Sequence, residues 1–187
     1  MIKIALTGGI GTGKSYISLQ FVKMNIPVYE ADKEAKKLYE RENVKKAIFA
    51  LFPEVVTDDH KIDFNVLSAI VFTDQIRLQL LNKIIHPLVM DGFDLWAKQQ
   101  QREVVILESA IIFENNLQSL FDLVILVDAP QEFCIQRIKL RNPTWSEIEI
   151  QQRICTQLSQ NEKKRLADII IDNEKDENSI IYRLQNY

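Results

Sequence analysis

The chain has 187 residues, of which 47% are hydrophobic and 26% charged, and its formal net charge is −3 at pH 7. This length suits one domain with room for an insertion, and the weakly acidic charge argues against a basic face for duplex nucleic acid. The N-terminal apolar run is too short for the core of a signal peptide, and no segment approaches the roughly 20 apolar residues of a membrane span. We therefore expect a cytoplasmic protein without a membrane or nucleic-acid partner.

Short apolar runs rich in Ile and Val predict β-strands. They cover residues 2–6, 27–29, 104–107, 123–127 and 169–171. The runs are nearly continuously apolar, which is typical of parallel strands covered on both faces. Longer amphipathic segments alternate with them, and the helices expected there cover 15–24, 32–41, 66–71, 75–85, 132–140 and 147–158. This alternation predicts an α/β fold with a parallel sheet, with ligands beyond the carboxyl ends of the strands.

A glycine-rich segment joins the first predicted strand to the first predicted helix. It reads Gly8-Gly9-Ile10-Gly11-Thr12-Gly13-Lys14-Ser15 and fits the P-loop pattern. Glycines let backbone N–H groups approach phosphate oxygens closely, and the N-terminus of the following helix favours anions. In this pattern Lys14 places a positive charge on the β- and γ-phosphates, and Ser15 offers its hydroxyl to Mg²⁺. We therefore predict ATP and Mg²⁺ as cofactors rather than a glycine-rich turn without a ligand. The nucleotide-binding residues predicted here are Gly9, Gly11, Thr12, Gly13, Lys14, Ser15 and Tyr16.

Two connections between the predicted strands are too long for plain crossovers. Residues 32–102 carry mainly helical patterns, and we expect a helical substrate subdomain there. Residues 131–166 carry two predicted helices, and we expect them to form a lid. Pro143 ends the first of these helices, and the expected cap of the second is Thr144 or Ser146. The predicted core consists of 1–31, 103–130 and 167–187.

The class of P-loop protein is narrowed by the size of the chain and by its insertions. A GTPase needs an Asn-Lys-x-Asp run, and the segment Asn173-Glu174-Lys175-Asp176 has these residues in a different order. Motor and transporter ATPases are usually much larger. The long helical insertion and the arginines of the predicted lid favour a small-molecule kinase. A nucleoside monophosphate kinase, or a nucleotide-sensing module without turnover, is the alternative at this point.

Several short motifs follow one another from residue 2 to residue 173. They are the segment from Leu6 to Ser15, Ala31-Asp32, Val71-Phe72, Ile85-His86-Pro87, Phe113-Glu114, Gln136-Arg137-x3-Arg141, Arg153-x3-Gln157 and Ala167-Asp168-x4-Asn173. In this order and spacing they resemble the dephospho-CoA kinase family. The resemblance implies a P-loop kinase fold, with a five-stranded parallel sheet flanked by helices, an inserted helical substrate subdomain and a helical lid. It also implies transfer of the ATP γ-phosphate to the 3′-hydroxyl of the ribose of dephospho-CoA, the last step of coenzyme A synthesis, and no obligate protein partner.

The resemblance implies roles on the acceptor side for three residues. Asp32 orients the 3′-hydroxyl or takes its proton, and the competing interpretation is an N-cap of the helix 33–39. His86 is a predicted substrate contact, against a structural histidine at the end of a helix before Pro87. Glu114 is a third predicted substrate contact, against a solvated surface charge.

On the phosphate side, Arg137 and Arg141 are four residues apart and share a helix face. We predict that both act in catalysis by stabilising charge on the transferring phosphoryl group, against the alternative of a solvated basic face. Arg153 either binds phosphate or forms an ion pair within the lid. Asn173 is a predicted adenine contact, against a turn residue.

Four positions depart from the pattern of the family: Tyr16, Phe64, Ala110 and Lys175. None of them is a catalytic residue in the assignment above. Phe64 stands where the family commonly has Arg, which leaves the acceptor contacts of the helical segment open.

Overall fold

The computed structural model describes residues 1–174. The chain divides into two compact units, one made of Met1–Tyr29 and Gln100–Tyr187 and the other of Glu30–Gln99. The bounds of the second unit, Glu30–Gln99, differ by only a few residues from those of the predicted helical insertion, 32–102. The predicted lid, 131–166, belongs to the first unit. Part of the predicted core, including Lys175, lies outside the described residues.

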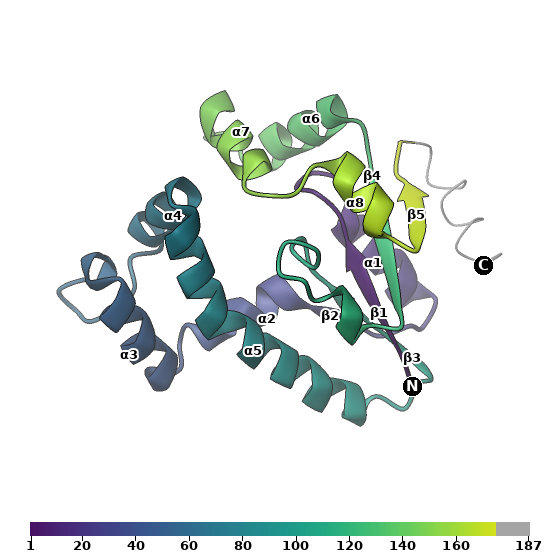
Figure 1. The fold of residues 1–187 in the computed structure, drawn as a ribbon, viewed down its shortest axis with the longest axis horizontal. Helices are drawn as coiled ribbons and strands as arrows, with labels where there is room; N and C mark the ends of the chain where they lie inside the picture. The colour runs from purple at the N-terminus through teal and green to yellow at the C-terminus, as the bar shows by residue number, and fades with distance from the viewer. Residues whose placement is uncertain (175–187) are drawn as a thin grey trace. The chain divides into compact units, whose positions relative to one another are not determined.

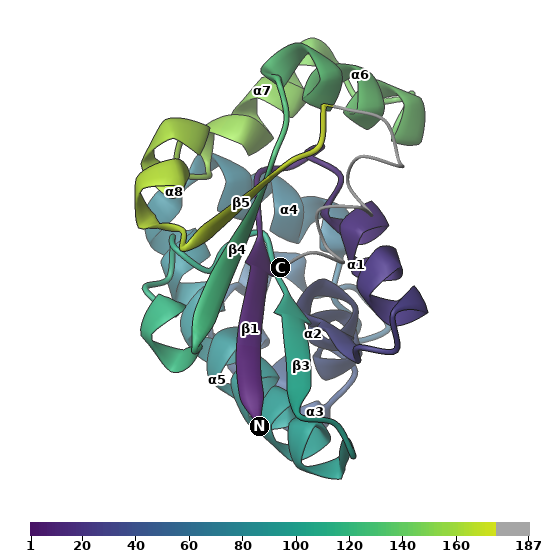
Figure 2. The ribbon, with the colours of Figure 1, turned by 90° about the vertical axis from the view of Figure 1, so that its right-hand side faces the viewer.

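The first unit contains a five-stranded sheet. Its strands are β1 (Ile2–Thr7), β2 (Val28–Glu30), β3 (Val104–Glu108), β4 (Leu123–Asp128) and β5 (Ile169–Asp172), in the spatial order β2-β3-β1-β4-β5. β1 pairs in parallel with β3 and β4, and β4 pairs in parallel with β5. In Figure 2, β5, β4, β1 and β3 lie side by side. The predicted α/β fold and its five strands are confirmed.

The core of this unit explains why the strands are continuously apolar. Leu6 of β1, Ile106 of β3 and Val127 of β4 pack in one buried cluster with Ile17 and Phe21 of helix α1 (Lys14–Lys23). Because α1 follows β1 after the glycine-rich loop, this packing fixes the loop at the carboxyl edge of the sheet. Ligands bind at this edge in parallel α/β sheets.

The remaining helical segments of the first unit are η2 (Gln118–Leu120), α6 (Gln131–Arg141), α7 (Glu147–Cys155) and α8 (Gln160–Leu166) (Figure 1). Of the two expected caps, Ser146 is the one that begins α7, in a capping box with Glu149. α8 was not predicted. It begins with a second capping box, in which Ser159 and Glu162 satisfy each other's backbone N–H groups.

The second unit is helical, as the pattern of 32–102 predicted. It contains α2 (Ala31–Leu38), α3 (Glu42–Leu51), η1 (Pro53–Val55), α4 (Phe64–Thr73) and α5 (Gln75–Gln99). α3 was not predicted. Phe64, at the start of α4, packs edge-on against the ring of Tyr39, with 5.2 Å between the ring centroids.

The expectation that a helix ends at His86 is wrong, because α5 continues through Pro87. A proline inside a helix removes one backbone hydrogen bond and usually ends or kinks the helix. Here the buried residues of α5 recur every four positions on both sides of the proline: they are Leu81, Ile85, Val89, Phe93 and Ala97. This continuous apolar face, buried within the unit, outweighs the local penalty.

Within residues 1–174, no helix combines the length and the apolar composition that crossing a membrane would require.

Candidate active site

Gly11 and Gly13 of the glycine-rich loop have conformations that favour glycine. Gly11 has a φ of 83°, and a Cβ atom there would lie 2.6 Å from the carbonyl oxygen of Cys134. Gly13 is the N-cap of α1, with a φ of 92°, and a Cβ atom there would lie 2.1 Å from Nδ2 of Asn173. Both conformations are unfavourable for residues with a side chain. The loop is therefore held close against α6 and against the end of β5.

A cavity of about 150 Å³ lies between this loop and α6. It is lined by Gly11, Gly13, Lys14, Ser15, Arg137, Ile138 and Arg141. The first N–H groups of a helix have no acceptor within the helix, and the N-terminus carries a partial positive charge. Here that terminus is joined by one ammonium and two guanidinium groups. The arrangement suits a polyphosphate.

Lys14 is largely buried and folds over its own loop. Its Nζ donates hydrogen bonds to the carbonyl oxygens of Gly8 and Gly9, at 2.9 and 3.1 Å. Thr12, also buried, donates its hydroxyl to the Gly9 carbonyl at 2.9 Å. Ser15 is exposed and lines the cavity.

Arg137 and Asn173 both donate hydrogen bonds to the loop. Arg137 donates to the carbonyl oxygens of Thr12 and Asn173, at 3.2 and 3.0 Å. Nδ2 of Asn173 donates to the same Thr12 carbonyl at 2.8 Å. Asn173 lies in the turn after β5, as its alternative interpretation held, and its contact with adenine stays a prediction. Arg137 and Arg141 line one cavity, which agrees with their predicted shared face.

Tyr16 and Arg153 make contacts that their predicted roles did not include. Tyr16 packs its ring against the core cluster of the sheet, and a contact between Tyr16 and the nucleotide stays a prediction. The guanidinium carbon of Arg153 lies 4.0 Å from the centroid of the Trp145 ring, a cation–π contact that neither interpretation of Arg153 foresaw.

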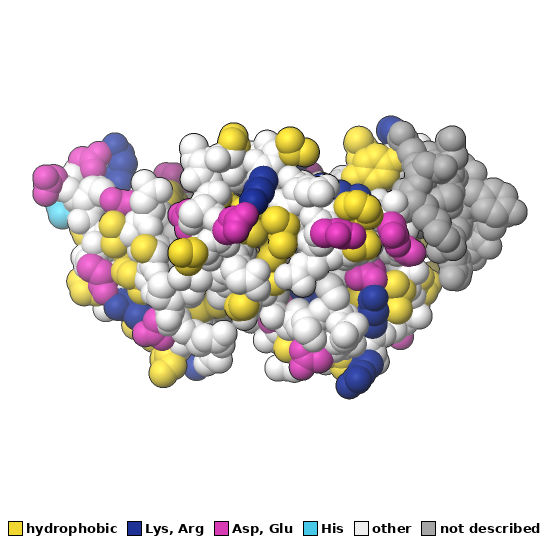
Figure 3. Space-filling view, turned by 90° about the horizontal axis from the view of Figure 1, so that it is seen from above, with side chains coloured by type: hydrophobic (Ala, Val, Ile, Leu, Met, Phe, Trp, Pro, Cys, Tyr) yellow, Lys and Arg dark blue, Asp and Glu magenta, His cyan; other side chains and the backbone are white. Residues whose placement is uncertain are grey.

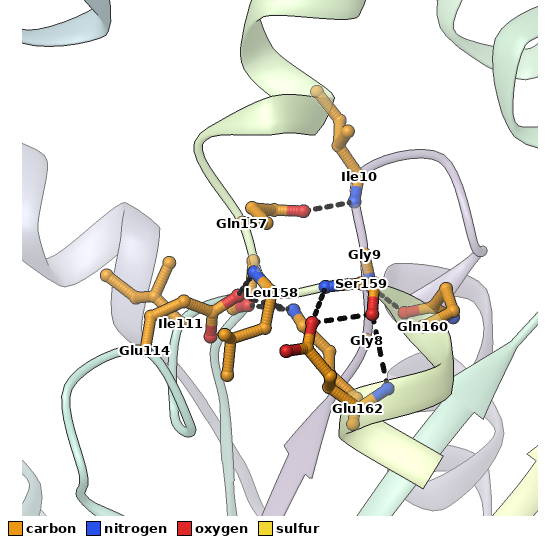
Figure 4. A network of polar contacts seen from close by, with 12 residues as sticks. Gly8, Gly9, Ile10, Ile111, Glu114, Gln157, Leu158, Ser159, Gln160 and Glu162 are labelled. Atoms are coloured by element: carbon orange, nitrogen blue, oxygen red, sulfur yellow. Dashed lines mark hydrogen bonds and ion pairs between the residues drawn. The ribbon is translucent and has the colours of Figure 1, made fainter.

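Glu114 is not a solvated charge. Its side chain is 13% exposed, and Oε1 forms a 2.7 Å ion pair with Nζ of Lys163, whose side chain is fully buried. The same oxygen accepts the backbone N–H of Leu158 at 3.0 Å, and Lys163 also donates to the Ala110 carbonyl at 3.0 Å. These contacts tie the segment after β3 to the start of α8 (Figure 4). They are internal to the protein, and a contact between Glu114 and substrate stays a prediction.

Two glutamines that the sequence did not single out contact the loop: Gln157, in the segment between α7 and α8, and Gln160, the first residue of α8. Oε1 of Gln157 accepts the N–H of Ile10 at 2.9 Å, and Oε1 of Gln160 accepts the N–H of Gly9 at 3.2 Å (Figure 4). Gln157 was noted only as part of a motif. Nothing in the spacing of Gln160 distinguishes it from a surface residue, because the contact spans 151 positions of sequence.

Glu108 is a further candidate functional residue that the sequence analysis did not identify. It is the last residue of β3 and is only 7% exposed. It lies in register with Leu6 of β1, just before the loop begins. The sequence carries a signal for Glu108, because it is a carboxylate at the end of an apolar strand, where ligands bind in parallel sheets.

Asp32 and His86, the remaining acceptor-side predictions, belong to the second unit. Asp32 lies inside the first turn of α2, whose N-cap is Glu30, so the interpretation of Asp32 as an N-cap is wrong. Its negative charge, after burial, is a cause of the raised pKa of Tyr39. His86 is half-buried within α5, and burial lowers its pKa. The cavity in the first unit is lined by six of the predicted phosphate-side residues: Gly11, Gly13, Lys14, Ser15, Arg137 and Arg141. Gly9, Thr12, Tyr16, Arg153 and Asn173 are not among the residues that line it.

Among residues 1–174, no group of three or more His, Cys, Asp or Glu side chains could hold a metal ion by itself. This is compatible with Mg²⁺, which usually keeps several waters and binds one or two protein ligands together with substrate phosphates.

A family model described as dephospho-CoA kinase matches residues 2–179. The chain belongs to the dephospho-CoA kinase family. Dephospho-CoA kinases from Thermobifida fusca and Oceanobacillus iheyensis are 34% and 35% identical to it, over 98% of this chain and 93% and 94% of theirs. The family catalyses the last step of coenzyme A biosynthesis with ATP and Mg²⁺, in agreement with the predicted function and cofactors.

Solved structures show the same fold. A Thermus thermophilus protein superimposes with a TM-score of 0.87 at 28% identity, over 99% of this chain and 94% of that one. The dephospho-CoA kinase of Campylobacter jejuni has a TM-score of 0.64 at 21% identity, over 98% and 95% of the chains. Shikimate kinase from Aquifex aeolicus, at 18% identity and a TM-score of 0.52 over 99% and 94%, shares the fold. The predicted P-loop kinase fold is therefore confirmed.

Proposed function

We propose that this chain phosphorylates dephospho-CoA in the cavity between the glycine-rich loop and α6. The ribose 3′-oxygen attacks the γ-phosphorus of ATP, the bond from that phosphorus to the β–γ bridging oxygen breaks, and ADP leaves. The observation that carries the proposal is the convergence of Lys14, Arg137 and Arg141 with the N-terminus of α1 around one cavity. Phosphoryl transfer depends mainly on such positioning and charge neutralisation.

Each cation has a distinct part in this proposal. Lys14 binds the β- and γ-phosphates while the carbonyl oxygens of Gly8 and Gly9 hold its ammonium group in place. Arg141 neutralises charge that develops on the γ-phosphoryl group. Arg137 holds the loop through the Thr12 carbonyl and adds its charge to the same cavity.

Mg²⁺, when bound, neutralises phosphate charge, and the residues of this chain that fit it are Ser15 and Glu108. The exposed Ser15 hydroxyl lies at the cavity, and Glu108 places a carboxylate at the carboxyl end of the neighbouring strand. A hydroxyl after the P-loop lysine and a strand-end carboxylate are the usual protein ligands of Mg²⁺ in P-loop enzymes.

Asp32 is the residue we assign to the acceptor. It follows β2 directly, at the start of α2, and a carboxylate there can hold the 3′-hydroxyl in line and take its proton. His86 and Glu114 are secondary candidates for substrate contacts.

We also propose that small molecules are the partners of this chain, in the cytoplasm and without an obligate protein partner. Lys and Arg side chains on the face seen in Figure 3 are scattered among Asp and Glu. This mixture supports small-molecule substrates, because nucleic-acid binding favours a continuous basic face.

The test is ADP release with ATP and Mg²⁺, measured with and without dephospho-CoA. We expect release to depend on dephospho-CoA and the product to carry a 3′-phosphate. A panel of nucleoside monophosphates and shikimate serves as the control for acceptor choice. Faster turnover with a panel member than with dephospho-CoA would overturn the proposal.

A further inference from the structure

Gln160 bridges the phosphate loop and the end of β4. The residue is the first of α8, and its side-chain amide has three partners. Oε1 accepts the N–H of Gly9 at 3.2 Å, and Nε2 donates to Oδ1 of Asp128 at 2.8 Å and to the Val127 carbonyl at 3.5 Å. The second carboxylate oxygen of Asp128 is paired with Nζ of Lys164 at 2.5 Å. Figure 4 shows the Gln160 side chain beside Gly9.

The hydrogen-bond partners of Gln160 determine where its amide oxygen and its NH₂ group lie. An ionised carboxylate only accepts hydrogen bonds, so Asp128 takes the NH₂ group of Gln160. A backbone N–H only donates, so Gly9 takes the amide oxygen. Lys164 in turn holds Asp128 in place. The orientation of Gln160 is therefore set by Asp128 together with the N–H of Gly9.

The peptide group between Gly8 and Gly9 is held at both of its ends. Its carbonyl oxygen accepts from Nζ of Lys14 at 2.9 Å, and its N–H donates to Gln160. The next peptide group repeats this arrangement, since the Gly9 carbonyl accepts from Lys14 at 3.1 Å and the Ile10 N–H donates to Gln157 at 2.9 Å. The Gly8–Gly9 peptide group has glycine on both sides and is therefore easy to rotate, and a rotated group would withdraw its carbonyl from Lys14.

We propose that Gln160, oriented by Asp128, is a positioning residue for the phosphate loop. It fixes the peptide group whose carbonyl holds the Lys14 ammonium, and so keeps the cation that meets the ATP phosphates in its place. Gln160 touches neither the nucleotide nor the acceptor in this role. The inference rests on the proposed function, because it assigns Lys14 to the phosphates of ATP.

The experiment is a double-mutant cycle at Asp128 and Gln160. Gln160→Glu replaces the NH₂ group by an acceptor that faces the Asp128 carboxylate, and we expect ATP affinity and kcat each to fall by about tenfold. Adding Asp128→Asn supplies an NH₂ group on the opposite side, so the pair is inverted and both values should recover. Asp128→Asn alone keeps an amide oxygen that accepts from Gln160 but loses the ion pair with the partly exposed Lys164, so its effect should be smaller than that of Gln160→Glu.

Additivity distinguishes two explanations of the effect of Gln160→Glu: a change of charge near the phosphates and a loss of positioning. If only charge mattered, the effects of the two single substitutions on ATP affinity would add in the double variant. The inference requires recovery beyond additivity, with thermal unfolding of all variants close to wild type. Gln152→Glu, at an exposed position of α7, introduces the same charge without contacting the loop and should behave as wild type.

Calorimetric ATP affinity needs no acceptor, so it tests the inference even if dephospho-CoA is not phosphorylated. In that case the proposed function fails, while the cycle still decides the role of Gln160. A double variant that is no better than the sum of the singles, or Gln160→Glu with wild-type affinity and kcat, would overturn the inference.

Discussion

The carboxylate of Glu114 and the ammonium group of Lys163 lie 2.7 Å apart, with the lysine side chain fully buried. The pair joins the segment that follows β3 to α8, so it holds in place the helix from which Gln160 reaches the loop. Oε2 of Glu114 is also buried, and it has no hydrogen-bond partner among the residues that the structure describes.

Removing one member of this pair should destabilise the protein strongly. Glu114→Ala leaves the Lys163 charge buried without its partner, and we expect the free energy of unfolding to fall by about 3–5 kcal/mol. Combining it with Lys163→Met removes the orphaned charge and should recover part of the loss. Urea unfolding measures both. Glu147→Ala breaks an exposed ion pair with Lys139 and should have a far smaller effect; equal losses in the two single variants would contradict this prediction.

Lys14→Ala should lower kcat by about 10²–10³-fold, the loss typical of removing one group that stabilises charge in a transition state. Steady-state kinetics of ADP release measure it, with circular dichroism as the check on folding. Lys23→Ala, an exposed lysine at the other end of α1, is the matched control. A folded Lys14→Ala enzyme with near-normal kcat would remove the loop from the mechanism.

Arg141→Ala should lower the single-turnover rate of phosphoryl transfer by about 10³-fold, because an arginine of this kind acts mainly on the transition-state charge. ATP affinity, measured by calorimetry, should change much less. Lys139→Ala removes a positive charge from the same helix at a partly exposed ion pair and should keep the wild-type rate. A large loss of ATP affinity with an intact rate would make Arg141 a ground-state binder.

Asp32→Asn should lower the rate of transfer to dephospho-CoA by about 10²–10⁴-fold, the usual contribution of a general base. Glu34→Gln is a close control, because Asp32 and Glu34 are both acidic residues in the first turn of α2 and interact similarly with the helix dipole. ATP affinity should be nearly unchanged in both variants. A loss below about threefold for Asp32→Asn, or equal losses in the two variants, would exclude Asp32 as the base.

His86 should make stability depend on pH below neutrality. Burial lowers its pKa below the usual 6.5, so the unfolded chain takes up a proton at a higher pH than the folded protein. The stabilisation is complete above about pH 6.5 and is lost as the pH falls toward the pKa of the folded state. Urea unfolding between about pH 7.5 and 5.5 should therefore show a steeper loss for wild type than for His86→Gln.

The other histidine supplies the control. His60 is exposed in a loop, with a φ of 55°, a conformation that asparagine tolerates well. His60→Asn should keep the wild-type dependence on pH. A wild-type dependence in His86→Gln as well would show that other groups cause it.

The sequence by itself determined the features that depend on neighbouring residues. Continuous apolar runs predicted all five strands because parallel strands are buried on both faces. The glycines and Lys14 predicted a phosphate loop because few backbone conformations can bring N–H groups around an anion. Ser146 was among the expected caps because its side chain satisfies a backbone group three residues away.

Tertiary structure decided what depends on residues far apart in the chain. α5 passes through Pro87 because its buried face extends on both sides, which local propensity does not register. Glu114 pairs with Lys163, 49 positions further along the chain, and neither the predicted substrate contact nor the alternative of a solvated charge anticipated this ion pair. Gln160 met Gly9 across 151 positions. Such contacts form only once the sheet has brought its strands together, because the free energy of each contact depends on burial that no short window of sequence contains.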